Sequence, residues 1–334
     1  MELRLDEAQA SLQDTVRRFC TDRFGLDRIA DREGRPTDRA AWRELGALGV
    51  LGLLTPDSGL GAVEAAVVFE QLGSHLVPGP TLWTVLAAPL VDGAASGAVL
   101  VGGIDSPDGP DGPDAGAPDV VEHAAEIDAL LLLQPDGVAL VAGDDLPRPE
   151  ELTPLDPLTP VGRYAARPVG RPVGDAADAI RLRRQGTVLS AALLLGLSDR
   201  ALEVARAYAL EREQFGVPIG SFQAVKHMLA DMYVRTGMAR SATYAAAALL
   251  DDPASHDATR RAGAAAAKLL AGEAAVENAA TAVQVLGGMG FTWAMLPNFL
   301  LKRAWVLEQS FGTADEHALA LGTALGEVGT RCGG

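Results

Sequence analysis

The sequence predicts a mainly helical protein with a small β-rich domain in its middle. Apolar residues recur with a helical period through almost the whole of residues 177–334. Residues 102–119 are instead rich in Gly, Pro and Asp, a composition that does not form a core. On both sides of this segment, short apolar runs separated by turn residues are typical of strands. These three observations indicate two helical domains with a reduced β domain between them.

The N-terminal helical domain is predicted to cover residues 1–92. Asp6 stands directly before the first periodic run, where its carboxylate is placed as the N-cap of a helix. Gly49 and Gly73 close two later helices, and a turn rich in Gly and Pro lies between them. The helices of this domain are expected at residues 5–32, 42–50, 62–72 and 82–91.

The middle domain, predicted for residues 93–176, is expected to be β-rich and to contain few ordered residues. Residues 102–119 are predicted to form a disordered loop, because they cannot bury enough apolar surface to offset the loss of chain entropy. Gln134-Pro-Asp-Gly137 has the composition of a tight hairpin turn. Strands are expected at residues 98–101, 129–133 and 138–142, with further short strands between residues 152 and 173.

The C-terminal domain, predicted for residues 177–334, has the pattern of a bundle of antiparallel helices. Gly216 and Pro218 end its first helix, and Ser221 is placed to cap the second. The helices are expected at residues 177–212, 222–250, 258–286, 297–310 and 314–328.

Bulk composition excludes several classes of partner. The 334 residues carry a net charge of −16, whereas nucleic acids and anionic membranes require a basic face. No apolar run approaches the roughly 20 residues that a membrane span requires, and the N-terminus lacks the apolar core of a signal peptide. Cys20 and Cys332 lie at opposite ends without metal-type spacing, so neither a metal site nor a disulfide framework is expected. We therefore predict a cytoplasmic protein with no nucleic-acid or membrane partner.

Two motifs in the C-terminal domain carry more specific information. Arg212-Glu-Gln-Phe-Gly-Val-Pro-Ile219 fills the turn between two helices, and Phe222-Gln-Ala-Val-Lys-His-Met228 begins the second of them. Gln284-Val-Leu-Gly-Gly-Met-Gly-Phe291 follows further downstream. In order and spacing, these motifs closely resemble those of the C-terminal domain of the acyl-CoA dehydrogenase family. The resemblance is strong at residues 189–321, weaker at residues 5–78 and poor at residues 93–178.

This resemblance implies contacts to FAD at a subunit interface. In relatives, the two motifs approach the adenosine diphosphate half of an FAD whose flavin lies mostly in a neighbouring subunit. The implied cofactor-binding residues are Arg212, Gln214, Phe215, Gln284, Gly287 and Gly288. Arg can donate paired, charge-assisted hydrogen bonds to phosphate, and Gln can donate from its side-chain amide. Two adjacent glycines let a ligand approach the backbone closely. Without the resemblance, the glycines would be a helix end and Arg212 a solvated surface charge.

The resemblance also implies that the catalytic carboxylate is missing. The base of most family members directly precedes a Gly-Thr pair, where this sequence has Phe311. Other members place the base on the first helix of the C-terminal domain, where this sequence has Gly186. No catalytic residue is therefore predicted in this chain. Asp315 and Glu316 are alternatives as a relocated base, although acidic residues in a first helical turn usually serve the helix dipole or face solvent.

The whole pattern resembles the short, non-catalytic subunit of the α2β2 acyl-CoA dehydrogenases of actinobacteria. The middle domain also lacks the Thr-Glu-Pro-type loop, the Gly-Ser-Asp-type loop and the Trp-containing strand that surround the flavin in the family. The resemblance implies FAD-dependent α,β-dehydrogenation of a bulky, steroid- or polyketide-like acyl-CoA. A full-length partner subunit would bind most of the acyl-CoA and supply the catalytic Glu, and an electron-transferring flavoprotein would accept the electrons. Two alternatives stay open, a self-sufficient homomeric dehydrogenase and a flavin-free scaffold with the same fold.

Overall fold

The computed structural model describes residues 4–107, 119–292 and 295–331. The chain forms two compact units, each built from segments that are remote in the sequence. Unit 1 comprises Met1–Glu33, Ala62–Val77 and Thr187–Gly334, and unit 2 comprises Gly34–Gly61 and Pro78–Gly186. The domain limits after residues 92 and 176 that the sequence suggests follow chain order and remain a proposal. The predicted fold class, mainly helical with a small β region, is confirmed.

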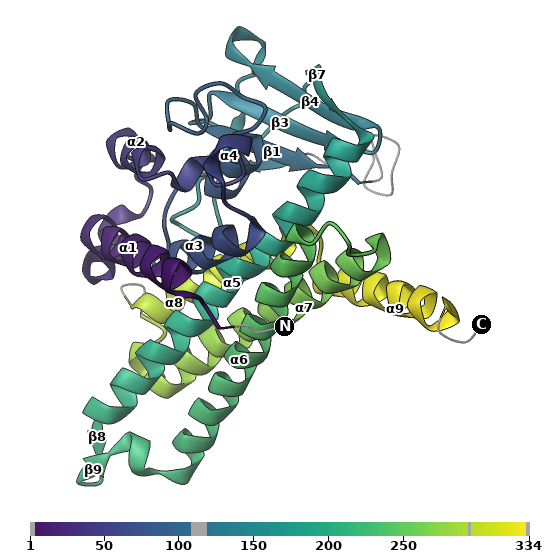
Figure 1. Cartoon of the computed structure of the whole chain (residues 1–334). Helices are drawn as coiled ribbons and strands as arrows, with labels where there is room; N and C mark the ends of the chain where they lie inside the picture. Colours follow the sequence, from purple (N-terminus) through teal and green to yellow (C-terminus); the bar gives the residue numbers. More distant parts are fainter. Residues whose placement is uncertain (1–3, 108–118, 293–294, 332–334) are drawn as a thin grey trace. The chain divides into compact units, whose positions relative to one another are not determined.

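Unit 1 is helical. Its α-helices, labelled in Figure 1, are α1 (Glu7–Arg23), α3 (Ala62–Ser74), most of α5 (Ala176–Glu211), α6 (Gln223–Asp251), α7 (Asp257–Leu286), α8 (Leu296–Gln309) and α9 (Ala314–Arg331). The 3₁₀ helices η1 (Leu26–Arg32) and η6 (Gly287–Met289) also belong to unit 1. The five helices predicted for the C-terminal region are confirmed. The first predicted helix is wrong in length, because α1 ends at Arg23 and a separate 3₁₀ helix follows the extended Gly25 (ψ 137°).

Two caps show how local sequence sets helix ends. Asp6 is the N-cap of α1 as predicted: its carboxylate accepts from the Gln9 backbone N–H at 2.8 Å, and the Gln9 side chain accepts from the Asp6 N–H at 3.1 Å. The prediction for Ser221 is wrong. Its hydroxyl donates backwards to the Pro218 carbonyl at 2.7 Å, and Phe222 is the N-cap residue of α6.

Close contact between α3 and α5 depends on two glycines. A Cβ on Gly73 would lie 2.1 Å from the Leu193 carbonyl oxygen, and a Cβ on Gly196 would lie 2.0 Å from the Glu70 carbonyl oxygen. Any side chain at either position would force the backbones apart, since real Cβ atoms do not come so close. The glycines therefore let α3 lie directly on α5.

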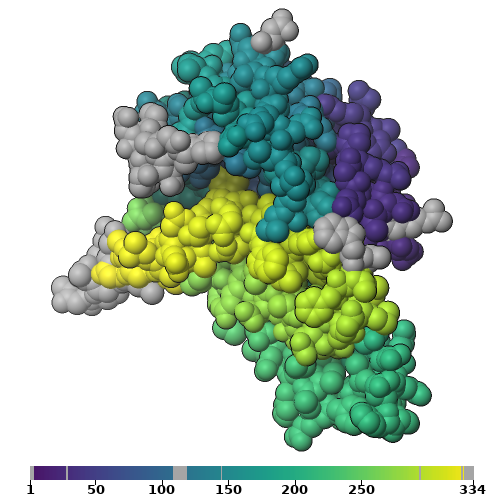
Figure 2. Space-filling view, turned by 180° about the vertical axis from the view of Figure 1, so that it is seen from behind, coloured from purple at the N-terminus to yellow at the C-terminus, as the bar shows by residue number. Residues whose placement is uncertain are grey.

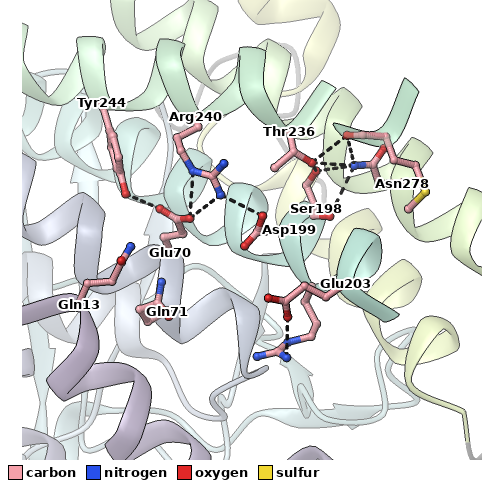
Figure 3. A network of polar contacts seen from close by, with 12 residues as sticks. Gln13, Glu70, Gln71, Ser198, Asp199, Glu203, Thr236, Arg240, Tyr244 and Asn278 are labelled. Atoms are coloured by element: carbon pink, nitrogen blue, oxygen red, sulfur yellow. Dashed lines mark hydrogen bonds and ion pairs between the residues drawn. The ribbon is translucent and has the colours of Figure 1, made fainter. Parts of the chain in front are cut away.

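A buried polar cluster joins α5, α6 and α7 (Figure 3). The side-chain amide of Asn278, which is fully buried, donates to the Ser198 hydroxyl at 2.8 Å and to the Thr236 hydroxyl at 2.9 Å. The Thr236 hydroxyl in turn donates to the Met232 carbonyl at 3.0 Å. Because each of these polar groups has a partner, the cluster fixes the relative register of the three helices without leaving buried groups unsatisfied.

Unit 2 contains short helices and two small sheets. The helices are α2 (Arg39–Ala47), η2 (Val50–Gly52), η3 (Pro56–Ser58), α4 (Thr81–Ala87) and η4 (Gly143–Asp145). The strands are β1 (Val101–Asp105), β2 (Val120–Glu122), β3 (Ala129–Gln134), β4 (Gly137–Ala142), β5 (Glu150–Leu152), β6 (Val161–Arg163) and β7 (Arg171–Asp175). One sheet has the order β1-β3-β4-β7 and the other the order β2-β6-β5. Among the described strands of unit 2, only β1 and β3 pair in parallel.

The predicted hairpin is confirmed, whereas the first strand is displaced. β3 and β4 pair as expected around Pro135 and Asp136, but the first strand is Val101–Asp105 rather than residues 98–101. Residues 102–105 were expected in the loop, yet they pair with β3 and are largely buried. The packing of Trp83 on α4 accounts for a glycine within this strand, because a Cβ on Gly103 would lie 2.0 Å from the Trp83 ring. Of the predicted loop, residues 108–118 lie outside the described residues.

Candidate functional site

The first motif forms an exposed hairpin at the end of the unit 1 bundle where α5 stops and α6 begins (Figure 1). Strands β8 (Glu213–Gln214) and β9 (Val217–Pro218) pair antiparallel, and η5 (Ile219–Ser221) leads into α6. The two turn residues, Phe215 and Gly216, have φ values of 54° and 79°, the pattern of a type I′ turn. The space-filling view shows this end of the bundle as part of the molecular surface (Figure 2).

The guanidinium group of Arg212, at the start of this hairpin, is available to bind a ligand. Its backbone is fixed, because its N–H donates to the Tyr208 carbonyl at 2.8 Å and its carbonyl accepts from the Ile219 N–H at 2.8 Å. Its side chain is exposed and has no hydrogen-bond or ion-pair partner within the described ranges. Gln214 is also exposed, and its amide nitrogen donates to the Glu213 carbonyl at 2.7 Å. Arg212 can therefore bind an anionic ligand without breaking an internal contact.

The second motif forms the C-terminal end of α7, where the glycine backbone is accessible to a ligand. Gln284 is exposed and lines a cavity of about 250 Å³ between α6 and α7. Gly287 has φ 62° and ψ −140°, a conformation that only glycine adopts readily. A Cβ on Gly288 would meet no atom within 4 Å, so its backbone is open to a ligand.

The two motifs lie at the same end of the bundle. The Tyr208 hydroxyl on α5 donates to the Met289 sulfur at 3.9 Å, and Met289 closes η6 directly after the paired glycines. Arg212 follows Tyr208 by one helical turn. A guanidinium and a free side-chain amide can donate to a pyrophosphate, and the accessible backbone at Gly287 and Gly288 allows its close approach, so these residues fit that part of FAD.

Exposed aromatic side chains surround this end of the bundle. Phe215 is 94% exposed and contacts Phe222 edge to face, with ring centroids 6.1 Å apart. Phe291 is 77% exposed beside the second motif. Large aromatic residues exposed together are typical of surfaces that bind another molecule.

Phe311, the residue that the resemblance places at the family's base position, is held in a strained conformation. It has φ 57°, rare for a residue other than glycine, and is only 7% exposed. The His317 ring donates from Nε2 to the Phe311 carbonyl at 2.8 Å. Lys268, itself buried, donates from Nζ to the carbonyls of Glu308 at 2.7 Å and Gly312 at 3.0 Å. Two side chains thus fix the backbone of this segment, but Phe311 cannot accept a proton.

Burial and nearby charges shift the pKa values of Lys268 and His317 in this segment. Burial lowers the pKa of Lys268 to about 8, against the opposing attraction of Glu308 and Glu316. Burial is also the main cause that lowers the pKa of His317, which favours the neutral form of its ring. These two residues are not evident as site residues from sequence alone. The one signal is that Lys268 interrupts a helix segment that otherwise consists of small and apolar residues.

The acidic residues near Phe311 cap the start of α9. Glu316 accepts from the Thr313 N–H at 2.7 Å and from the Thr313 hydroxyl at 3.0 Å, and the backbone hydrogen bond is the main cause that lowers its pKa. Glu308 accepts from the Ala314 N–H at 2.9 Å. Asp315 is exposed to solvent. A base that removes a carbon-bound proton benefits from a raised pKa, so these contacts do not favour a relocated base.

Gly186, the residue that the resemblance places at the second base position, lies buried within α5. Neither of these two residues has a carboxylate. Among the described residues, no group of His, Cys, Asp and Glu could hold a metal ion. No helix in that part of the chain has the length and apolar character to cross a membrane.

A larger cavity of about 530 Å³ lies between α1, α3, α5 and α6, and most of its charged residues pair with one another. Arg240 donates to Glu70 at 2.9 Å and to Asp199 at 3.0 Å, and Tyr244 donates to the same Glu70 carboxylate (Figure 3). Glu70 is 2% exposed. Since these contacts balance the charges internally, the cluster stabilises the bundle and carries no evident chemistry.

Comparison with known proteins assigns the chain to a family. Residues 181–325 match the C-terminal domain of acyl-CoA dehydrogenases and residues 6–96 the N-terminal domain. The chain is 32% identical to acyl-CoA dehydrogenase IpdE2 of Mycobacterium tuberculosis over 319 residues, covering 89% of this chain and 91% of IpdE2. The solved ChsE4–ChsE5 complex from the same organism has a TM-score of 0.81 at 27% identity, covering 98% of this chain and 99% of the matched chain. The Tcur3481–Tcur3483 steroid ACAD variant shares the fold, with a TM-score of 0.83 at 23% identity, covering 97% of this chain and 99% of that one. The chain therefore belongs to the acyl-CoA dehydrogenase family.

Proposed function

We propose that this chain is a non-catalytic subunit of an FAD-dependent acyl-CoA dehydrogenase complex. One observation carries the proposal. The residue at the proposed base position is Phe311, whose backbone is held by a hydrogen bond but whose side chain cannot accept a proton. Removal of an α-proton from an acyl thioester requires a carboxylate close to that carbon. Because the nearby Glu308 and Glu316 cap a helix, the catalytic Glu belongs to a partner subunit.

The contribution of this chain is to bind the nucleotide end of FAD. Arg212, Gln214 and Gln284 would donate to the pyrophosphate and adenine portion, Phe215 would pack against it, and Gly287 and Gly288 would let it approach the backbone. When bound, FAD supplies the acceptor for the hydride that leaves the β-carbon of the substrate. The supporting observation is that Arg212 has no internal partner among the described residues and lies at the same end of the bundle as the glycine pair.

The partner is a full-length acyl-CoA dehydrogenase subunit in an α2β2 assembly, with FAD shared at the interface. Two similar solved structures are described by paired names, ChsE4–ChsE5 and Tcur3481–Tcur3483, and the second is called a steroid ACAD. By analogy, the substrate is a bulky, steroid- or polyketide-like acyl-CoA bound mainly by the partner. An electron-transferring flavoprotein accepts the electrons, and the complex acts in the cytoplasm.

Co-expression with a full-length acyl-CoA dehydrogenase from the same genome tests this function. We expect a yellow, active complex with one FAD for each pair of unlike chains, and a colourless, inactive protein when this chain is expressed alone. The variant Arg212→Ala should weaken FAD retention about tenfold or more, since it removes a charge-assisted contact. The matched control is Arg206→Ala, which removes an exposed arginine of α5 and should leave the flavin content unchanged.

Other outcomes would reject the proposal in distinct ways. An active yellow protein from this chain alone would support a homomeric dehydrogenase with Glu316 or Asp315 as base. A colourless complex with any full-length partner would support a flavin-free scaffold. Equal flavin loss in the Arg206→Ala and Arg212→Ala complexes would show that the effect is not local to the hairpin.

A further inference from the structure

The cavity of about 530 Å³ between α1, α3, α5 and α6 has polar walls beyond its ion-pair cluster. Every residue that lines it belongs to unit 1. Among the described residues that line it, only Leu5 has a wholly apolar side chain. A cavity of this volume can hold a small molecule, but walls of this kind do not suit an acyl chain.

One arginine orients two glutamine side chains of this cavity. Gln13 and Arg17 lie on α1, and Gln71 lies on α3. The Gln13 side-chain oxygen accepts from Arg17 Nη2 at 3.2 Å, and the Gln71 side-chain oxygen accepts from Arg17 Nε at 3.2 Å. Because each oxygen is bound to the guanidinium, each amide nitrogen is turned away from it, and both amide groups point toward Glu70 (Figure 3).

The amide nitrogens of these two glutamines have no acceptor in the described part of the chain. Gln71 is 5% exposed, and neither its nitrogen nor that of Gln13 donates a hydrogen bond there. A buried donor without an acceptor costs roughly 1–3 kcal/mol, so buried polar groups generally have a partner. An acceptor inside the cavity would satisfy both amides.

The wall formed by α5 offers acceptors instead. Asp199 and Glu203 are one helical turn apart and both line the cavity. Asp199 pairs with Arg240 and is 34% exposed, whereas Glu203 pairs with Arg200 and is 57% exposed. An ionised carboxylate can accept about four hydrogen bonds, so both groups can accept further donors. The cavity therefore combines amide donors on α1 and α3 with carboxylate acceptors on α5.

The charges that line the cavity cancel. Three guanidinium groups and three carboxylates are present, those of Arg17, Arg200, Arg240, Glu70, Asp199 and Glu203. Burial is the main cause that lowers the pKa of His75, which favours its neutral ring. A ligand with a net charge would enter this site without a counter-charge, which is unfavourable in a partly buried position. The balance therefore favours a neutral ligand.

We propose that this cavity binds a free sugar or polyol, a small neutral molecule with neighbouring hydroxyl groups. A hydroxyl group both donates and accepts, so such a ligand can accept from the two amides and donate to the two carboxylates. A nucleoside fits less well, because its base needs an aromatic or apolar surface on which to stack. Tyr244, the one aromatic residue among the described lining residues, is only 5% exposed, and its hydroxyl is bonded to Glu70.

This cavity is distinct from the hairpin that is proposed to bind FAD. It contains none of the proposed cofactor-binding residues. Binding of a sugar can be measured without FAD, acyl-CoA or partner subunit. A failure of this inference would therefore leave the proposed function standing, and the reverse is also true.

A titration of the purified full-length chain with probes of matched size and different charge provides the test. D-glucose is neutral, D-glucuronate is an anion and D-glucosamine is a cation, and each has neighbouring hydroxyl groups. Saturation-transfer NMR should show that glucose binds and that both charged sugars bind more weakly. Adenosine, as the nucleoside probe, should also bind more weakly than glucose.

Two variants with matched controls locate the binding in this cavity. Gln71→Leu keeps the size of the side chain but removes the amide, and should raise the dissociation constant for glucose about fivefold or more. Gln223→Leu, at an exposed position on α6, should leave it unchanged.

Glu203→Gln should weaken glucose binding about threefold or more, because it removes a charged acceptor. It also leaves the cavity with one excess positive charge, so glucuronate should gain affinity relative to glucose. Glu273→Gln, at an exposed position on α7, should change neither affinity. Circular dichroism of each variant checks that the chain is folded.

Three results would overturn the inference. Glucose could fail to bind the wild-type chain. A folded Gln71→Leu variant could bind glucose as tightly as Gln223→Leu does, which would place any binding elsewhere on the chain. Glucuronate, glucosamine or adenosine could bind the wild-type chain more tightly than glucose, which would show that the cavity selects a charged ligand or a nucleoside instead of a neutral sugar.

Discussion

A single carboxylate, Glu70, shows how the residues of unit 1 hold the bundle together. It is 2% exposed, and a buried carboxylate is stable only when it is paired and hydrogen-bonded. Arg240 and Tyr244, both on α6, supply these contacts to a residue on α3. The interaction therefore ties together two helices through residues that are 170 positions apart in the sequence.

The substitution Tyr244→Phe should destabilise the chain by about 1.5–3 kcal/mol, because it removes a hydrogen bond to a buried charge. Urea unfolding followed by circular dichroism measures this difference. Tyr233→Phe on the same helix is the matched control, since Tyr233 is 71% exposed, and it should change the free energy of unfolding by less than about 0.5 kcal/mol. Equal effects of the two variants would contradict the role assigned to Glu70.

Lys268 is one of two residues whose side chains hold the backbone around Phe311. Lys268→Met keeps the length of the side chain but leaves the carbonyls of Glu308 and Gly312 without their donor. We expect a loss of about 1–3 kcal/mol in unfolding free energy. Lys226→Met, at an exposed site on α6, should be neutral in the same urea titration. A neutral Lys268→Met would show that other contacts suffice to hold the strained Phe311.

At the scale of the elements, the long helices could be predicted because their evidence is local. The apolar period, Asp6 before α1 and the Gly216–Pro218 turn all lie within the segments that they define. The displaced strand β1 had no such local signal. Gly102 and Gly103 look like loop residues, and only packing of Trp83 on β1 makes a glycine suitable there.

His75 links three elements of unit 1 and makes their packing sensitive to pH. Its Nδ1–H donates to the Gln71 carbonyl at 2.8 Å, so Nε2 can accept from Thr21 on α1 and from Arg200 on α5. Burial is the main cause that lowers the pKa of His75, and the positive charges of Arg200, Arg17 and Arg32 lower it further. The folded chain therefore prefers the neutral ring.

Because the pKa of His75 is lower in the folded than in the unfolded chain, acid should favour unfolding. Between the two pKa values the unfolded chain binds more protons, so stability is complete above about pH 6.5 and falls as the pH drops below it. The difference in unfolding free energy between the wild type and His75→Gln should therefore shrink from pH 7 to pH 5. His227→Gln, at an exposed site, is the control. A difference that stays constant with pH would contradict this role for His75.

At the scale of the whole molecule, sequence motifs located the candidate site only in part. The resemblance of the two motifs to a known family implies which residues approach a cofactor, and this stays a prediction. The Tyr208–Met289 contact brings the two motifs to one end of the bundle. The pairing of Glu70 with Arg240 and the support of Phe311 by Lys268 could not be predicted. These contacts join residues remote in sequence, and neither pair has a spacing that indicates the contact.

The exposed hairpin should contribute to assembly much more than to folding. Phe215 has φ 54° and is 94% exposed, so Phe215→Asp removes almost no buried area, and Asp tolerates this backbone conformation well. The free energy of unfolding of the isolated chain should change by less than about 0.5 kcal/mol. If the partner subunit and FAD cover Phe215, the same variant should weaken the complex about tenfold or more, since it places a charge in an apolar contact.

Val169→Asp is the control for this last prediction, because Val169 is 92% exposed in unit 2, away from the hairpin residues in sequence. It should change neither the unfolding free energy nor the affinity for the partner, as titration of labelled partner by fluorescence anisotropy would measure. Two side chains of equal exposure would then differ only in what they contact after assembly. If both variants bind the partner like the wild type, the hairpin is not part of the interface, and the proposed sharing of FAD would have to be abandoned.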